Sequence, residues 1–127
     1  MPRFVILYHQ MPAESKRASH WDLMLETGQV LRTWALDDQP QPGSVINATA
    51  LSDHRLAYLD YEGPVSGNRG VVERWDEGEY RLRSNTASQW QIELRGKRLA
   101  CDVELAGSSG NSNRWTVVFG PVPNDRR

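Results

Sequence analysis

The sequence predicts an all-β, mainly antiparallel fold: a small β-barrel with at most short helices. Apolar residues recur at alternate positions over short runs, the pattern of strands that bury one face. The 127 residues include 10 glycines and 7 prolines, most of them between these runs, and this spacing leaves little room for long helices. So many short strands in a chain of this length indicate a barrel or a sandwich.

The first predicted strand is a run of β-branched and aromatic residues at positions 4–8. Two runs, 21–26 and 30–36, flank the turn sequence Thr27-Gly28-Gln29 and predict a hairpin. The same alternation continues to the end of the chain. It predicts further strands at residues 48–51, 56–61, 71–75, 80–84, 89–94, 98–105 and 115–119.

Between these strands the sequence predicts tight turns and few helical residues. Asp76-Glu77-Gly78 and Arg95-Gly96-Lys97 combine polar residues with glycine, which is typical of turns. Helical turns are expected only within residues 12–19 or near Asp53. Residues 107–113, rich in glycine, serine and asparagine, are expected to form a flexible loop.

Length and composition limit the class of protein. We expect one barrel domain over residues 1–122 and a loose tail at 123–127. Lys and Arg total 15 against 16 for Asp and Glu, a net charge of −1. This charge argues against binding along duplex DNA, although it permits local contact with a strand end. The single cysteine, Cys101, excludes a disulfide framework and a thiolate zinc site. Without a long apolar run or a signal peptide, we expect a cytoplasmic protein with no membrane contact.

Two histidines and an aspartate form the strongest candidate site. His20 and Asp22 lie two residues apart on a predicted strand, so their side chains share a face, and Trp21 points to the opposite, core face. His9 ends the preceding strand and can lie alongside them. Two imidazoles and one carboxylate suit Mn, Fe or Zn. The same pair on a solvated face, with only a local hydrogen bond, is the alternative interpretation of this spacing.

Ordered segments over nearly the whole chain resemble one family. They are RFVILYH at 3–9, HWDLMLE at 20–26, VLRTWA at 30–35, DHRLAYLDYEG at 53–63 and VERWDEG at 72–78. Together they resemble the 3′-phosphoesterase domain of bacterial DNA ligase D, also known as the polymerase-ligase N-terminal domain. In that family the second segment is similar to His-Tyr-Asp-Leu-Arg-Leu-Glu.

The resemblance implies a small β-barrel with a manganese site in a surface groove, acting in DNA repair. The family removes a 3′-terminal ribonucleoside and then a 3′-phosphate from DNA ends, in a pathway with a DNA ligase or polymerase. Carried over to this chain, the metal ligands are His9, His20 and Asp22, with Mn²⁺ or another divalent ion. His54 and Tyr58 then contact the phosphate.

The chain departs from the family in its phosphate-binding cations. Met24 stands where the family has an arginine, and Asp38 aligns near a family lysine. The segment between His9 and His20 is also longer, and it contains Lys16 and Arg17. The candidate replacements for the lost arginine are Arg69, which is flanked by glycine-rich sequence, and Arg32; Arg55 is a further nearby cation.

These departures leave three functions open. The first is a metal-dependent phosphoesterase acting on nucleic-acid 3′ ends. The second is an end-binding or scaffold module of a repair complex, with weak or no catalysis. The third is a ferrous oxygenase, because His20, Asp22 and a distal His54 imitate a two-histidine, one-carboxylate triad.

Overall fold

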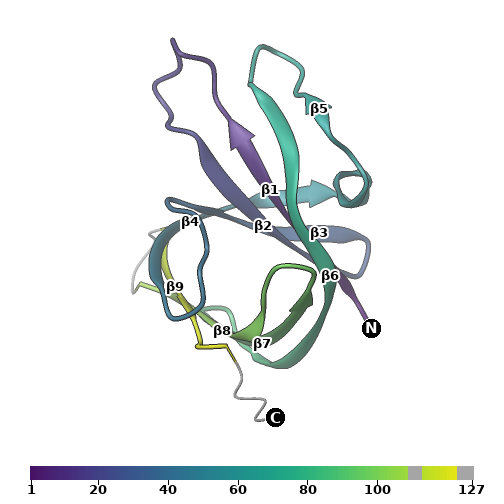
Figure 1. The fold of residues 1–127 in the computed structure, drawn as a ribbon, viewed down its shortest axis with the longest axis vertical. Coiled ribbons are helices and arrows are strands. Elements are labelled where there is room, and N and C mark those ends of the chain that lie inside the picture. The colour runs from purple at the N-terminus through teal and green to yellow at the C-terminus, as the bar shows by residue number, and fades with distance from the viewer. Residues whose placement is uncertain (109–112, 123–127) are drawn as a thin grey trace.

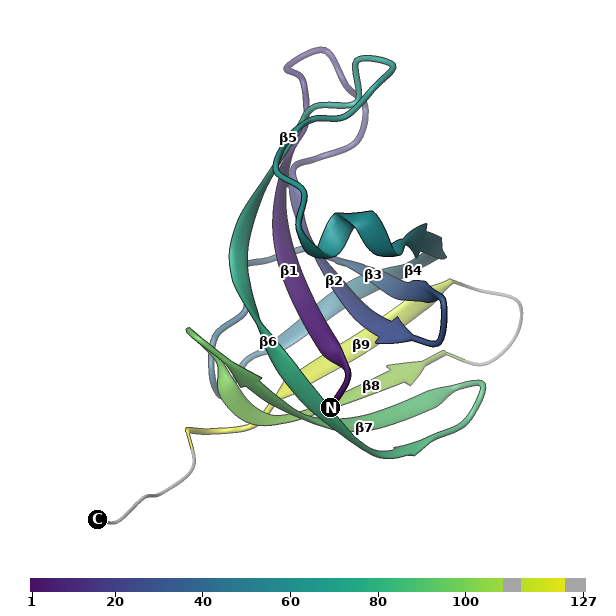
Figure 2. The same cartoon turned by 90° about the vertical axis from the view of Figure 1, so that its right-hand side faces the viewer.

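Eight strands close into an antiparallel barrel in the computed structural model, which describes residues 1–108 and 113–122. The ring runs β1-β2-β3-β4-β9-β8-β7-β6, and β6 pairs back onto β1 (Figures 1 and 2). The predicted all-β barrel is therefore confirmed. Its strands are β1 (Arg3–Gln10), β2 (His20–Thr27), β3 (Val30–Leu36), β4 (Val45–Arg55), β6 (Val71–Asn85), β7 (Gln89–Gly96), β8 (Ala100–Gly107) and β9 (Arg114–Phe119).

Two short elements lie outside the ring. A 3-10 helix, η1 (Leu56–Leu59), follows β4 and leads to the two-residue strand β5 (Gly63–Pro64). β5 adds to the edge of β6 near its start. No α-helix occurs among the described residues, and none of their helices has the length and apolarity to cross a membrane.

The barrel interior is filled by alternate residues of every wall strand. Trp34 has no exposed surface, and the rings of Trp90 and Trp115 meet it edge-on, with centroids 5.5 Å away. Such edge-to-face pairs add to the stability that burial already provides. Cys101 is buried in the same cluster, and burial raises the pKa of its thiol. This core fixes the strands that carry the site.

A second apolar cluster lies on the outside of the barrel, and it determines where the site forms. It consists of Val5, Leu7, Met24, Leu31, Leu59 and Val72. Figure 2 shows η1 lying against the outer face of β1 and β2. The wall of β1, β2 and β3 is consequently buried on both faces, and a polar cavity lies beside the outer cluster.

The structure corrects two predicted elements. The strand predicted at 56–61 is η1, because Leu56 and Leu59 are three residues apart and a 3-10 turn directs both at the outer cluster. The turn predicted at 76–78 lies inside β6, so the strands predicted at 71–75 and 80–84 are one strand. A bulge opposite Ile6 and Leu7 interrupts its register with β1.

Other local predictions have simpler outcomes. Residues 12–19 contain no helix; a hydrogen bond from Ser15 N to Pro12 O, at 3.0 Å, closes a single turn at 12–15. The turn predicted at Arg95-Gly96-Lys97 lies later in the chain, at Lys97 and Arg98, because Arg95 and Gly96 belong to β7. The predicted loop at 107–113 lies largely outside the described residues, and the predicted tail at 123–127 lies wholly outside them.

Candidate metal centre and its cavity

The β1–β2 pairing brings the three predicted metal ligands together on the outer face of the barrel. His9 and His20 are direct partners in the antiparallel register, and their ring centroids are 4.8 Å apart. Asp22 follows His20 on the same face by the two-residue strand period. One ligand atom from each residue lies within 4.8 Å of the others. The placement of His20 and Asp22 on one face follows from their spacing in the sequence. The position of His9 beside His20 follows from the pairing register of β1 and β2.

Two backbone carbonyls fix the orientation of the imidazoles. His20 Nδ1 lies 2.9 Å from Ala18 O, and His9 Nε2 lies 2.6 Å from Arg69 O. A carbonyl oxygen only accepts, so these nitrogens carry the protons. The opposite nitrogens, His20 Nε2 and His9 Nδ1, each lie 3.2 Å from an oxygen of Asp22. A hydrogen bond from the far ring nitrogen to a backbone carbonyl is typical of metal-ligating histidines.

The facing atoms are electron-rich and buried. His20 Nε2 and Asp22 Oδ1 have no hydrogen-bond partner among the described residues, despite their 3.2 Å separation. Burial raises the pKa of a carboxyl, but His20 and His9 together lower that of Asp22 from 3.8 to about 2. The hydrogen bond to Asp22 raises the pKa of His9 above 6.5. The arrangement of His9, His20 and Asp22 therefore favours a positive charge, from a proton or a metal ion, between the imidazoles and the carboxylate.

The donor set fits a divalent ion. Two ligands at about 2.1 Å from a metal, with an angle of 90–110° between them, are roughly 3.0–3.4 Å apart. The two 3.2 Å separations lie in this range. Imidazole and carboxylate ligands suit Mn²⁺, Fe²⁺ or Zn²⁺. The unpartnered nitrogen and oxygen are the atoms that such an ion would satisfy.

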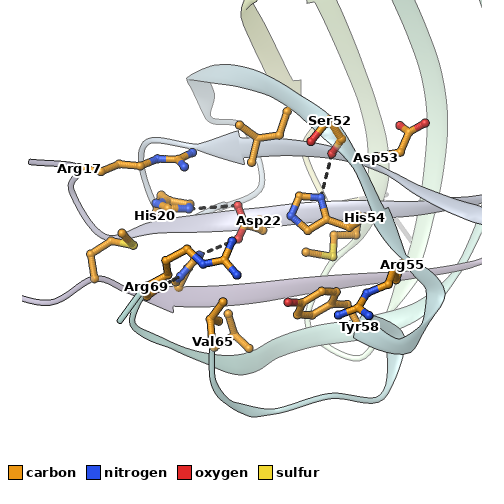
Figure 3. A pocket seen from close by; sticks show the side chains of 15 residues that line it. Arg17, His20, Asp22, Ser52, Asp53, His54, Arg55, Tyr58, Val65 and Arg69 are labelled. Carbon is orange, nitrogen blue, oxygen red and sulfur yellow. Dashed lines mark hydrogen bonds and ion pairs between the residues drawn. The ribbon is translucent and has the colours of Figure 1, made fainter. Parts of the chain in front are cut away.

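A cavity of about 420 Å³ opens beside the cluster and is walled by two further predicted residues. His54 comes from the end of β4 and Tyr58 from η1, and their ring centroids are 5.7 Å apart. The hydrogen bond between His54 Nδ1 and Ser52 O, at 2.9 Å, leaves His54 Nε2 available. Figure 3 shows both side chains across the cavity from His20 and Asp22.

Three arginines line the same cavity: Arg17, Arg55 and Arg69. None of them forms an ion pair with a carboxylate of the described residues. Arg69 instead donates to Ser66 through Nε and Nη2, at 2.7 Å to the carbonyl and 3.2 Å to the hydroxyl. Cations without a carboxylate partner around one cavity suit a phosphate ligand.

The structure separates the two candidate replacements for the family arginine. Arg69 lines the cavity, but Arg32 does not, because it lies on the opposite face of β3. The Arg32 guanidinium covers the Trp34 ring at 4.9 Å from its centroid. Met24 lines the cavity floor with 1% of its surface exposed. Asp38 is exposed and does not line the cavity.

Sequence reasoning named Arg17 only as a cation of the longer segment, and it missed the backbone carbonyl of Arg69. Arg17, on the extended segment after β1, reaches the cavity, so the longer connection adds a cation there. Its position in that segment was the available signal. The carbonyl of Arg69 anchors His9 across 60 residues of sequence. A backbone contact over that separation leaves no pattern in the residues themselves.

Comparison with known proteins identifies the family of this chain. Residues 10–107 match the family model of the DNA Ligase D 3′-phosphoesterase domain. The chain belongs to this family. His20, Asp22, His54 and Tyr58 fall within the matched segment, and His9 immediately precedes it.

Longer relatives are also similar to this chain. It is 30% identical over 121 residues to the multifunctional non-homologous end joining protein LigD of Mycobacterium bovis. The same identity holds for the multifunctional non-homologous end joining DNA repair protein LigD of Mycobacterium tuberculosis, strain H37Rv. The match covers 88% of this chain but 15% of each relative. The chain thus corresponds to a small part of these larger proteins.

Proposed function

We propose that this protein is a metal-dependent phosphoesterase that processes nucleic-acid 3′ ends in DNA repair. Membership of the DNA ligase D 3′-phosphoesterase family supports the end-processing role. The observation that carries the finer proposal is the pair of buried, unpartnered atoms, His20 Nε2 and Asp22 Oδ1, facing a cavity lined by unpaired arginines. A 3′-phosphate or a 3′-terminal ribonucleoside is the group removed.

His9, His20 and Asp22 would hold the divalent ion, for which Mn²⁺ is our proposal. When bound, such an ion polarises a phosphoryl oxygen and lowers the pKa of a bound water. The Ala18 and Arg69 carbonyls keep the imidazoles in the ligating tautomer. The proposed partners are a nucleic-acid 3′ end and a DNA ligase or polymerase of the same pathway, in the cytoplasm.

The opposite wall supplies hydrogen-bond donors to the phosphate. The Tyr58 hydroxyl lies on that wall, where it can donate to oxygens that gain charge in the transition state. His54 Nε2 can donate there when the ring is an imidazolium, because the proton on Nδ1 is held by Ser52 O. Arg69 is held by two bonds to Ser66, so its guanidinium needs little reordering to bind phosphate. These residues replace the hydration that the phosphate loses on entering the cavity.

Hydrolysis of defined 3′ ends tests this proposal. The protein, loaded with Mn²⁺, is incubated with DNA strands that end in a 3′-phosphate, a 3′-ribonucleotide or a plain 3′-hydroxyl. We expect phosphate or nucleoside release from the first two. Asp22→Asn should abolish release and weaken Mn²⁺ binding in calorimetry. Asp53→Asn is the matched control, because Asp53 lines the cavity outside the ligand cluster. A fully active Asp22→Asn variant would contradict the proposed site.

A specific observation also favours the end-binding module. Met24 gives the cavity an apolar floor where the family has an arginine. Tight, Mn²⁺-dependent binding of a 3′-phosphate end without turnover would assign the protein to this second function.

The oxygenase triad loses its specific support. His54 is not a member of the ligand cluster, and its Nδ1 is bound to Ser52 O. The cluster takes His9 as its second histidine instead.

A further inference from the structure

A second recess of about 220 Å³ lies next to the metal cavity. Arg55, Tyr58 and Val65 line both spaces, so the two spaces adjoin at these side chains. The recess adds the ring of Tyr61, which is 36% exposed, and the pyrrolidine of Pro64. The metal cavity contains the polar ligand cluster, and the adjoining recess contains the aromatic rings.

The aromatic end is a ladder of rings leading away from the ligand cluster. His54 and Tyr58 have centroids 5.7 Å apart, and Tyr58 and Tyr61 have the same separation with an interplanar angle of 87°. The perpendicular arrangement leaves a face of Tyr61 uncovered by Tyr58. An exposed ring face beside a cation is the combination on which single-stranded nucleic-acid binders stack bases.

The Tyr61 ring is held in place from both sides. Its neighbour Asp60 is paired with Arg3 of β1 at 3.0 Å, and its other neighbour, Glu62, accepts from Arg74 N of β6 at 2.8 Å. The Tyr61 hydroxyl itself donates to Pro64 O. Since these bonds fix the segment to the barrel, the ring is ordered before any ligand arrives.

We propose that this recess is the subsite for the nucleobase of the terminal nucleoside whose 3′-phosphate enters the metal cavity. The proposal rests on the proposed function, because it assigns the phosphate to that cavity. Tyr61 stacks on the base, and Arg55 contacts the nucleic-acid backbone where it passes from one space to the other. Stacking on a ring face is tolerant of base identity, so the subsite recognises the presence of a base and not its sequence.

Binding to an end without a base tests the subsite. The probes are two fluorescent DNA strands that end in a 3′-phosphate, one on a normal nucleoside and one on an abasic sugar. Their affinities for the Mn²⁺-loaded protein are measured by anisotropy. We expect the abasic end to bind about 5- to 150-fold more weakly, the range of one base stacked on one ring. Tyr61→Ser should lose this preference, and Tyr61→Phe should keep it.

The outcomes separate the subsite from the hydrolytic function. Equal binding of the two ends by the wild type, or no binding of either, overturns the subsite. An unchanged preference in a folded Tyr61→Ser protein, checked by its thermal unfolding, also overturns it. A base preference that depends on Tyr61, in a protein that hydrolyses neither end, supports the subsite and contradicts the phosphoesterase activity.

Discussion

The carboxylate of Asp22 lies between two imidazoles whose protons are held by carbonyls on the far side of each ring. The negative charge of Asp22 is therefore balanced only when a positive charge lies between its carboxylate and the two rings. Either a proton on an imidazole or a metal ion can supply this positive charge. The same residue therefore links the stability of the metal-free protein to pH, and in the proposed function it also links activity to metal.

Acid should destabilise the metal-free protein through Asp22. Its pKa is about 2 in the folded state and about 3.8 when ordinarily solvated. A lowered pKa means that the stabilisation is present above about pH 4 and is lost as the pH falls toward 2. Urea unfolding at a series of pH values should show this loss. Asp22→Asn should give a shallower acid dependence, and an identical slope in both proteins would contradict the assignment.

Met24 is the residue at which a single change should increase catalysis most. A charged hydrogen bond to phosphate contributes about 1.5–3 kcal/mol. Met24→Arg should therefore raise kcat/KM for a 3′-phosphate end by on the order of 10- to 150-fold, if the bond forms in the transition state. Met24→Leu is the control, because it keeps the apolar floor without a donor. Equal rates for wild type and Met24→Arg would show that another cation already holds the phosphate.

At the scale of elements, the segment from η1 to the start of β6 closes the site. It packs Leu59 and Val65 over the outer cluster, and it contributes Tyr58 and Arg69 to the cavity. Arg69 contributes twice, through its carbonyl to His9 and through its guanidinium to the cavity. One substitution can separate these two contributions.

Arg69→Ala should weaken phosphate binding without weakening metal binding. The variant keeps the backbone carbonyl that anchors His9, while it removes the guanidinium. We expect kcat/KM to fall roughly 10- to 150-fold, from the loss of one charged hydrogen bond. Calorimetry with Mn²⁺ should give an unchanged affinity. A parallel loss of both would mean that the guanidinium supports the ligand cluster itself.

Strand β6 depends on a buried carboxylate remote from the site. Asp76 is 3% exposed and accepts from the backbone N–H groups of Glu77, Arg98 and Leu99. It thereby ties the bulge in β6 to the turn between β7 and β8. The Asp76 carboxylate is the acceptor that these three N–H groups share.

Asp76→Ala should destabilise the barrel but spare the metal centre. Loss of the buried bond to Leu99 N costs about 1–3 kcal/mol, and loss of the two half-buried bonds costs less for each, so we expect a total loss of about 2–4 kcal/mol in urea unfolding. Asp102→Ala is the control, because that exposed carboxylate lies on β8 outside the bulge. Native-state Mn²⁺ affinity should not change in Asp76→Ala. A stability loss under 1 kcal/mol would contradict the role assigned to these bonds.

At the scale of the whole molecule, one barrel wall serves two purposes. The inner face of β1 and β2 contributes to the interior core, and the outer face carries the ligand cluster and the second apolar cluster. The interior core thus directly supports the strands that carry the ligand cluster. Figure 2 shows the two connections, residues 11–19 and 65–70, projecting together from one end of the barrel, and they bring Arg17 and Arg69 to the cavity.

Metal binding should stabilise the whole barrel because the ligands come from two adjacent wall strands. At a free Mn²⁺ concentration 100 times its Kd, binding to the native state alone contributes about 2.7 kcal/mol. For a domain of this size the Tm should rise by on the order of 10 °C. Thermal unfolding with and without Mn²⁺ measures the shift. It should be absent in Asp22→Asn and present in Asp53→Asn; a shift in both variants would place the ion elsewhere.

The sequence by itself determined the features that depend on local spacing. Strand alternation was enough to place His20 and Asp22 on one face and Trp21 on the other. The many short strands and turns limited the fold to a barrel or a sandwich, and the family resemblance favoured the barrel that the structure has. Tertiary structure decided the rest. The β1–β2 register paired His9 with His20, and the alternation of β3 turned Arg32 away from Met24.

Local periodicity gave the wrong element at two places. The two leucines of η1 pack against an apolar cluster formed by distant strands. At residues 76–78, backbone N–H groups of the β7–β8 turn bind Asp76 and keep it inside a strand. The physical reason is that a side chain's direction follows from its own backbone, whereas its partners follow from contacts between residues far apart in the chain.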